Sequence, residues 1–308
     1  MLIVTGASGF IGSHLAEALA RTGRPFTLSS RSPGASVRPH RFIPADRLAD
    51  ARMEADCIIH LAGRAHVLRE TSLDPAAQFR SANTAYTLSV ARAFADRGTR
   101  RFIFLSSIGV LGNETAPGRP FTQESPPAPH NDYALSKLEA EEGLRAIAAE
   151  TGMDVVIIRP PLVYGAGAKG NFASMVGWLR KGVPLPLGSV HNRRSLVGID
   201  NLVDLILTAI DHAAAANRTF LVSDGEDLST TDLLRRTAAA MGRPARLLPV
   251  PTPLLRRTAR LLGRATLAQR LLGSLELDIA FTRETLDWQP PISVDEGLAR
   301  AVHPGATA

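Results

Sequence analysis

Three glycines near the start of the chain most constrain its fold. An apolar run at residues 2–4 is followed at once by Gly6, Gly9 and Gly12, spaced three residues apart. Gly6 permits a tight turn, Gly9 allows a pyrophosphate to approach the backbone, and Gly12 allows a helix to pack closely on the preceding strand. The N–H groups at the start of such a helix attract phosphate. Because the triplet lies between a predicted strand and a predicted helix, it indicates a dinucleotide-binding unit.

Short apolar runs alternate with helical patterns through the first half of the chain. The further strand candidates are residues 26–29, 57–61, 102–105 and 155–158, and the helical stretches are 11–22, 76–95 and 133–149. The strand candidates are continuously apolar, as expected where helices cover both faces of a sheet. The sequence therefore predicts an α/β fold, a Rossmann-type doubly wound parallel sheet.

The pattern changes after Tyr164, where segments rich in Gly, Pro and Arg carry isolated helices. We expect an NAD(P)-binding Rossmann domain at residues 1–165, with a return segment near 196–215. The smaller C-terminal part, residues 166–308, is expected to bind mainly substrate. A proline-rich loop without periodicity separates two of the predicted elements at residues 112–131, and loops of this length are more often functional than decorative.

The composition narrows the classes of partner that the protein is expected to bind. The 308-residue chain carries a formal charge of +6, which favours anionic partners, although solvated surface arginines account for most of such an excess. Aromatic residues make up only 5% of the chain, so we expect no nucleic acid. A phosphorylated small molecule explains the charge equally well. Cys57 is the only cysteine and the histidines lack ligand spacing, so no metal site is predicted.

The N-terminus has no basic residue before Arg21, and charged residues interrupt every long apolar stretch. We therefore expect a cytoplasmic protein. One stretch, residues 253–275, combines leucines with five arginines in an amphipathic pattern. Such a pattern can lie on a membrane surface, but more often it packs on its own domain. We expect the packed arrangement and no membrane contact.

The residue just past the second strand meets the adenosine ribose of a dinucleotide. There the chain reads Ser29, Ser30, Arg31, with no acid to accept hydrogen bonds from the 2′-hydroxyl of NAD. Arginine suits the 2′-phosphate of NADP, so we favour NADP(H), with Arg31 as its ligand, and leave NAD(H) open. Asp46, after the third short strand, either holds the adenine amino group or caps the helix that follows.

Tyr133 and Lys137 open a predicted helix and, being four residues apart, share one of its faces. A phenol with a pKa of about 10 is a poor acid–base group at neutral pH, and a neighbouring ammonium favours its phenolate. We therefore predict proton transfer by Tyr133, with Lys137 tuning it. The strand at 102–105 ends in Ser106 and Ser107, and we choose the Ser107 hydroxyl to bind the reacting oxygen.

Together these clusters resemble the extended short-chain dehydrogenase/reductases, which include sugar-nucleotide epimerases, dehydratases and reductases. The resemblance covers essentially the whole chain. It rests on residues 5–12, 59–63, Asn83, 104–107, Tyr133 with Lys137, and 159–165. It implies that the cofactor is lined, besides the glycine turn, Tyr133 and Lys137, by Phe10, Ile11, Leu61, Ala62, Gly63, Asn83, Pro160 and Val163.

The resemblance also implies which residues contact the substrate. The segment 194–200 matches the stretch whose arginine contacts the nucleotide diphosphate, so Arg194 takes that role, and Asn171 is a weaker candidate. A dehydratase of this family needs an acidic pair beside the catalytic hydroxyl, and residues 107–110 contain no acid. Dehydration is therefore disfavoured. Relatives commonly form homodimers through two helices of the nucleotide-binding part, and we expect a homodimer here.

Residues 160–167, 191–196 and 222–230 look like the subgroup that reduces UDP-4-keto-6-deoxy-N-acetylhexosamines to UDP-N-acetylquinovosamine for bacterial surface polysaccharide such as lipopolysaccharide. We therefore expect an NAD(P)H-dependent 4-ketoreductase acting on a UDP-sugar. The alternative is a UDP-sugar 4-epimerase, of the UDP-GlcNAc/UDP-GalNAc type, that keeps NAD tightly bound. A catalytically silent NADP sensor is a third hypothesis, which the presence of both Tyr133 and Lys137 disfavours.

Overall fold

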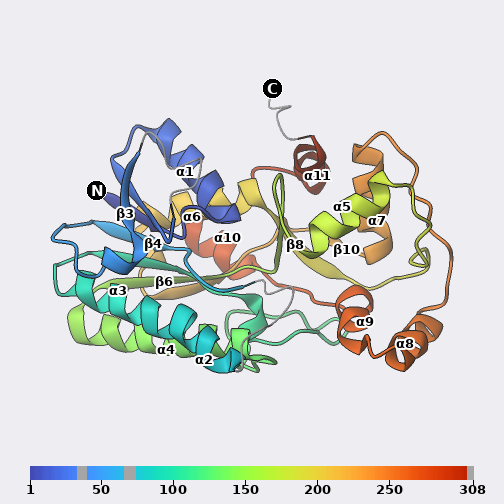
Figure 1. Ribbon diagram of the computed structural model, residues 1–308, viewed down its shortest axis with the longest axis horizontal. Helices are drawn as coiled ribbons and strands as arrows, with labels where there is room; N and C mark the ends of the chain where they lie inside the picture. Colours follow the sequence, from blue (N-terminus) through green and yellow to red (C-terminus); the bar gives the residue numbers. More distant parts are fainter. Residues whose placement is uncertain (33–39, 66–73, 304–308) are drawn as a thin grey trace.

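The centre of the protein is a parallel sheet, shown in Figure 1. This computed structural model describes residues 1–32, 40–65 and 74–303. Within them seven strands pair in parallel in the order β3-β2-β1-β4-β5-β6-β9. The strands are β1 (Leu2–Thr5), β2 (Phe26–Ser30), β3 (Arg41–Pro44), β4 (Cys57–His60), β5 (Arg101–Leu105), β6 (Asp154–Arg159) and β9 (Arg218–Leu221). The predicted doubly wound fold is confirmed.

Helices cover both faces of this sheet, which explains the continuously apolar strands. The side chains of β1 alternate between two buried cores: Val4 packs with α1 (Phe10–Thr22) and α6 (Ile199–Asp211), and Ile3 packs with α3 (Tyr86–Ala95) and α4 (Asp132–Thr151). Figure 1 shows these two helical layers above and below the sheet. The order of the strands reverses beside β1, and a ligand site in such sheets lies at the carboxyl ends of the strands at that point.

The helix predicted at 76–95 is continuous but irregular. It consists of α2 (Pro75–Phe79), the π-helical turn η3 (Arg80–Ala85) and α3. A π-helical turn rotates the side chains that follow relative to a regular helix, and such turns are frequent at functional sites. Here the turn carries the fully buried Asn83.

The C-terminal half builds a second, three-stranded sheet in the order β10-β8-β7. Its strands and nearby helices are β7 (Leu162–Tyr164), β8 (Arg194–Gly198), β10 (Asp227–Leu228), α5 (Asn171–Arg180), α7 (Thr230–Ala240) and α11 (Val294–Val302). Strand β8 runs directly into α6, and β9 then joins the large sheet. The chain therefore crosses back to the nucleotide-binding part after β8, and the division at residue 165 stays a prediction.

The proline-rich loop is tied to a distant segment of the chain. Thr115 N–H donates to the carbonyl of Ser274 at 2.8 Å, and Phe121 N–H donates to that of Glu276 at 2.8 Å. Beyond Ser274 the chain continues to α10 (Ala280–Leu286). The backbone hydrogen bonds of Thr115 and Phe121 join the loop after β5 to the substrate-side half of the chain. Elsewhere in the described residues, the short 3-10 turns are η2 (Ala45–Arg47), η4 (Ile108–Val110) and η5 (Ala213–Ala215).

The amphipathic stretch forms two short helices, α8 (Thr252–Leu261) and α9 (Ala265–Leu272), at the lower right of Figure 1. Leu255, Ala268 and Leu271 pack against the core below them. Leu254 and Leu261 remain exposed. The expected packing on the domain therefore describes one side of the pair only. In the described ranges no helix is both long and apolar enough to cross a bilayer.

His60, at the end of β4, predicts a specific pH dependence of stability. Its ring is fully buried between the hydroxyls of Thr5, 3.1 Å from Nδ1, and Thr87, 3.0 Å from Nε2. Burial lowers the pKa of His60 to about 3. Between pH 6 and 4 the unfolded chain binds a proton that the folded one excludes, so the free energy of unfolding falls as pH falls, by up to about 1.4 kcal/mol per pH unit.

We expect His60→Asn to reduce this slope in urea titrations made at several pH values. The control is His191→Asn, because His191 is exposed. Equal slopes in the wild type and His60→Asn would show that His60 does not resist protonation in the folded protein.

Candidate active site

The glycine turn has the geometry of a phosphate-binding loop. Gly6 has a φ of +69°, which favours glycine, and a Cβ there would lie 2.7 Å from the Ala62 nitrogen. A Cβ on Gly12 would lie 2.3 Å from the Gly6 carbonyl oxygen. Helix α1 has Gly9 as its N-cap, with no side-chain cap and no acid in its first turn. Its N–H groups therefore point at the carboxyl edge of the sheet without a side-chain acceptor, and they fit a dinucleotide pyrophosphate.

The end of β2 carries no carboxylate. Ser30 Oγ donates to the carbonyl of Ser32 at 2.6 Å, and Arg31 is exposed. Asp46 is also exposed, and it lies in η2 just past the end of β3. The N-cap position of η2 is Pro44, so Asp46 does not cap that turn. Both side chains border the same carboxyl edge of the sheet, where the adenosine end of a dinucleotide binds in this fold.

Asn83 holds the segment after β4 against α4. Its Oδ1 accepts the Arg64 N–H at 2.7 Å, and its Nδ2 donates to Ser136 Oγ at 3.0 Å. A Cβ on Gly63 would lie 3.1 Å from Asn83 Oδ1 and 3.3 Å from Lys137 Nζ. The structure thus brings Gly63, and with it Leu61 and Ala62, beside the predicted lysine.

Ser107, Tyr133 and Lys137 come from two elements that meet at this edge. Ser107 follows β5 and accepts the Gly109 N–H at 3.1 Å, and its hydroxyl lies near the Tyr133 phenol. Tyr133 lies in the first turn of α4, which Asn131 caps by accepting the Ala134 N–H at 2.8 Å. Lys137, one turn on, donates to the Leu105 carbonyl at 2.8 Å. The structure therefore brings the three predicted catalytic residues together.

Burial has the largest effect on the pKa values of Tyr133 and Lys137. It raises the pKa of Tyr133, and the nearby Ser107 hydroxyl opposes that rise. Burial also lowers the pKa of Lys137 to about 7, with Glu141 acting in the opposite direction. Burial therefore acts against the lowering of the tyrosine pKa that the sequence predicts from the charge of Lys137, and this tuning by Lys137 stays a prediction.

The two serines after β5 have different surroundings. Ser106 Oγ donates to Glu141 Oε1 at 2.6 Å, so it belongs to a buried polar cluster. Ser107 instead accepts the Gly109 N–H, and its hydroxyl lies near the Tyr133 phenol. The choice of Ser107 stays a prediction, and the structure supplies a physical reason for it, since the hydroxyl of Ser106 is bound to a carboxylate.

Sequence reasoning missed the centre of that cluster. Glu141 is 0% exposed and forms a two-point ion pair with Arg159, which is 4% exposed, through contacts of 2.9 and 2.5 Å. Arg145, one turn further along α4, also reaches Glu141 at 3.0 Å. The available signal was spacing: Glu141 follows Lys137 by four residues, so the two lie on the same inward face of α4. His130 was missed as well; it is exposed, lies beside Gly109 and is close to Tyr133 in the chain.

The predicted substrate-side residues lie on the C-terminal half. Arg194 opens β8, and its guanidinium donates to the carbonyl of Gly273, the C-cap of α9, at 3.0 Å. Burial lowers the pKa of Arg194. Asn171 begins α5 and is exposed. No distance places Arg194 or Asn171 against the catalytic three, so both roles stay predictions.

The remaining cofactor candidates lie on segments that border the turn. Pro160 accepts the Ile108 N–H at 3.0 Å, next to Ser107, and Val163 is half-buried in β7. Phe10 and Ile11 are half-buried at the start of α1. No group of three His, Cys, Asp or Glu residues in the described part of the chain is arranged to hold a metal ion.

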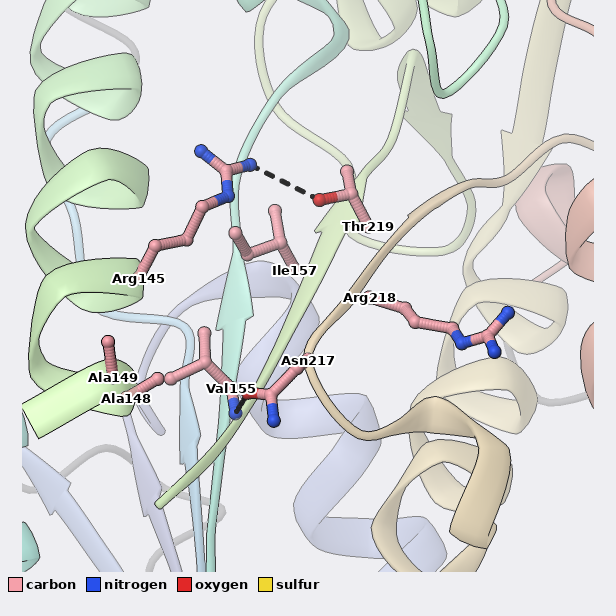
Figure 2. Close-up of a pocket in the computed structure, with 8 residues that line it drawn as sticks. All are labelled: Arg145, Ala148, Ala149, Val155, Ile157, Asn217, Arg218 and Thr219. Carbon is pink, nitrogen blue, oxygen red and sulfur yellow. Dashed lines mark hydrogen bonds between the residues drawn. The ribbon is translucent and has the colours of Figure 1, made fainter. Parts of the chain in front are cut away.

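One hollow lies elsewhere on the molecule. Its volume is about 240 Å³, and Figure 2 shows Arg145 and Arg218 on its rim, with Arg145 reaching Thr219 Oγ1 at 3.2 Å. It is formed by α4, β6 and the start of β9 and is lined by Arg145, Ala148, Ala149, Val155, Ile157, Asn217, Arg218 and Thr219. None of the predicted site residues lines it, so we place the chemistry at the carboxyl edge of the sheet instead.

Comparison with known proteins shows the family to which the chain belongs. Residues 2–223 match the model of the NAD dependent epimerase/dehydratase family, and the chain belongs to that family. A UDP-glucose 4-epimerase from Vibrio cholerae is 43% identical over 96% of this chain and 93% of its own length. A GDP-6-deoxy-D-mannose reductase from Pseudomonas aeruginosa is 28% identical over 96% of this chain and 94% of its own.

A solved structure of RMD from Pseudomonas aeruginosa, complexed with NADPH, superposes with a TM-score of 0.76. It is 25% identical and covers 98% of each chain. The relatives therefore include both an epimerase and a reductase, and they agree on a nicotinamide-dinucleotide fold.

The buried ion pair gives a prediction about stability. We expect Glu141→Gln to lower the free energy of unfolding by about 3–5 kcal/mol, because it leaves the Arg159 guanidinium buried without its carboxylate. Urea denaturation monitored by fluorescence measures the change. Glu139→Gln is the matched control on the same helix, since Glu139 pairs with the exposed Arg80 and its loss should cost about 0–1 kcal/mol. Similar costs for the two variants would contradict the central role given to Glu141.

Proposed function

We propose that the protein is an NADPH-dependent reductase of the C4 ketone of a UDP-linked 4-keto-6-deoxy-N-acetylhexosamine. This proposal rests on the end of β2, where Arg31 is present and a carboxylate is absent. An arginine at this place favours the 2′-phosphate of NADP. A cofactor that is consumed in each turnover must exchange, which suits a reductase and not an enzyme that regenerates its cofactor.

The chemistry follows from the three grouped residues. Bound NADPH supplies the hydride that reduces the ketone. Tyr133 donates its proton to the oxygen that becomes the alcohol, and the positive charge of Lys137 favours this transfer by stabilising the phenolate left behind. Ser107 donates a hydrogen bond to the same oxygen, and thereby stabilises the negative charge that develops there.

Lys137 and Arg194 position the reactants. Lys137 is held by the Leu105 carbonyl beside Gly63, where its ammonium can bind the nicotinamide ribose and favour loss of the tyrosine proton. Arg194, partly desolvated at the start of β8, is proposed to bind the nucleotide diphosphate, since a weakly hydrated guanidinium forms strong paired hydrogen bonds to phosphate. The relatives that act on nucleotide-linked sugars support this substrate class.

A UDP-sugar 4-epimerase is the second candidate. The 43% identity to an epimerase favours it, and so does the same set of Ser107, Tyr133 and Lys137. An epimerase must first remove the C4 hydroxyl proton, so its tyrosine has to act as a base before it acts as an acid. Arg31 counts against it, because an acid at the end of β2 would suit a tightly bound NAD. A homodimer and a role in surface-polysaccharide synthesis remain part of the proposal in either case.

One assay separates the candidates. The purified protein is incubated with NADPH and the product of a UDP-GlcNAc 4,6-dehydratase, and NADPH absorbance is followed. We expect consumption of one NADPH per sugar, with the C4 configuration read by NMR. Tyr133→Phe should lower turnover by about 10²–10⁴-fold while NADPH still binds. Interconversion of UDP-GlcNAc and UDP-GalNAc without added cofactor, and no NADPH oxidation, would replace the reductase by the epimerase.

The Arg31→Ala variant tests whether Arg31 gives the protein its proposed preference for NADPH over NADH. We expect the KM for NADPH to rise about tenfold or more and the KM for NADH to stay within about twofold, because only NADPH loses a charge-assisted hydrogen bond. Steady-state kinetics with both cofactors measures this. Arg21→Ala, at the exposed far end of α1, is the control. An equal rise for both cofactors would mean that Arg31 does not read the 2′-phosphate.

A further inference from the structure

The outer face of the α8–α9 pair combines exposed leucines with arginines. Leu254 is 55% exposed, Leu261 80% and Leu262 67%. Arg257 and Arg264 are exposed next to them in the chain. We call these five residues the α8–α9 outer face.

Helical spacing explains why these side chains lie together. Leu254, Arg257 and Leu261 are separated by three and four residues, so they share one side of α8. Leu255, one position on from Leu254, turns inward to a core that includes Leu185 and Leu234. The pair is therefore anchored to the protein by one side, and its other side presents leucine and arginine to the surroundings.

The charge of this surface is of one sign. Residues 252–272 contain five arginines and no acid. Arg256 turns towards Glu114, 3.9 Å away. Arg257 and Arg264 form no ion pair with any carboxylate in the described ranges. Unpaired cations beside exposed leucines indicate a partner that is both anionic and apolar, since a surface of this kind is stabilised by covering it with matching groups.

We propose that the α8–α9 outer face docks on an anionic lipid bilayer. A bilayer surface offers phosphates to the arginines and, a few ångströms deeper, acyl chains to the leucines, which is how amphipathic helices bind membrane interfaces. A second copy of the chain fits less well. In a twofold contact through this face, the unpaired arginines of the two copies would meet without any acid in the pair to neutralise them.

The docking surface lies apart from the nucleotide-binding end of the molecule, and it is linked to the proposed substrate side through Gly273, the C-cap of α9, to which Arg194 donates. Figure 1 shows α8 and α9 at the opposite end of the molecule from α3 and β3. Docking therefore leaves the glycine turn and the large sheet free. This proposal goes beyond the proposed function and departs from the expectation of no membrane contact, because that expectation rested on packing that covers only the inner side of the pair.

Vesicle sedimentation tests the proposal with the full chain. The probes are vesicles of phosphatidylcholine alone and vesicles containing one quarter phosphatidylglycerol. We expect binding to the phosphatidylglycerol vesicles only, weakened by added salt. The double variants Leu254→Ser/Leu261→Ser and Arg257→Glu/Arg264→Glu should each lower the partition coefficient about tenfold or more. Both should keep the turnover of the wild type in solution without vesicles.

The matched control is Arg41→Glu/Arg52→Glu, which changes the net charge equally at exposed arginines near β3. It should bind vesicles within about twofold of the wild type. The proposal fails if the wild type does not bind the phosphatidylglycerol vesicles. It also fails if the control loses as much vesicle binding as the α8 and α9 variants, or if the leucine variant binds the vesicles as well as the wild type does. It also fails if the leucine variant turns a dimer into a monomer in size-exclusion chromatography and the wild type shows no vesicle binding.

Discussion

The buried ion pair between Glu141 and Arg159 is the interaction on which the rest of the site depends. It joins α4 to β6 and, through Ser106, to the end of β5. Taking two charges out of water is costly, and the pair persists because its lone pairs and protons are matched by further hydrogen bonds. The same helix carries Tyr133 and Lys137. Their position over the carboxyl ends of the strands is therefore set by a contact that neither of them makes.

This arrangement also explains which features were readable from the sequence. The glycine turn and the four-residue spacing of Tyr133 and Lys137 are local patterns, so they predicted the strand, turn and helix that the structure contains. The partner of Glu141 comes from a strand 18 residues later, and only the folded sheet brings Arg159 to it. The π-helical turn around Asn83 was likewise hidden, because it depends on how that residue packs against α4.

Burial adds an effect on the pKa of Tyr133 that residue types alone do not reveal. A lysine near a tyrosine lowers the pKa of the phenol in an aqueous setting, and the sequence says nothing of how much water the pair retains. In the folded protein both groups lose water, so the tyrosine keeps its proton and the lysine more readily loses its own. Negative phosphates near Lys137 would raise the pKa of Lys137 again, since an opposite charge favours the ammonium form.

The substrate side is built on different elements, and they connect it to the proposed docking surface. Arg194 donates to Gly273, the residue that ends α9, and the loop at 112–131 is bonded to the segment that follows. A shift of α9 would therefore alter the surroundings of the guanidinium proposed to bind diphosphate. The direction of any such effect depends on whether Arg194 keeps the Gly273 carbonyl or exchanges it for phosphate. Because an arginine has five N–H donors, it can hold that carbonyl and a diphosphate at once. With this geometry, docking of α8 and α9 on a bilayer is compatible with substrate binding by Arg194.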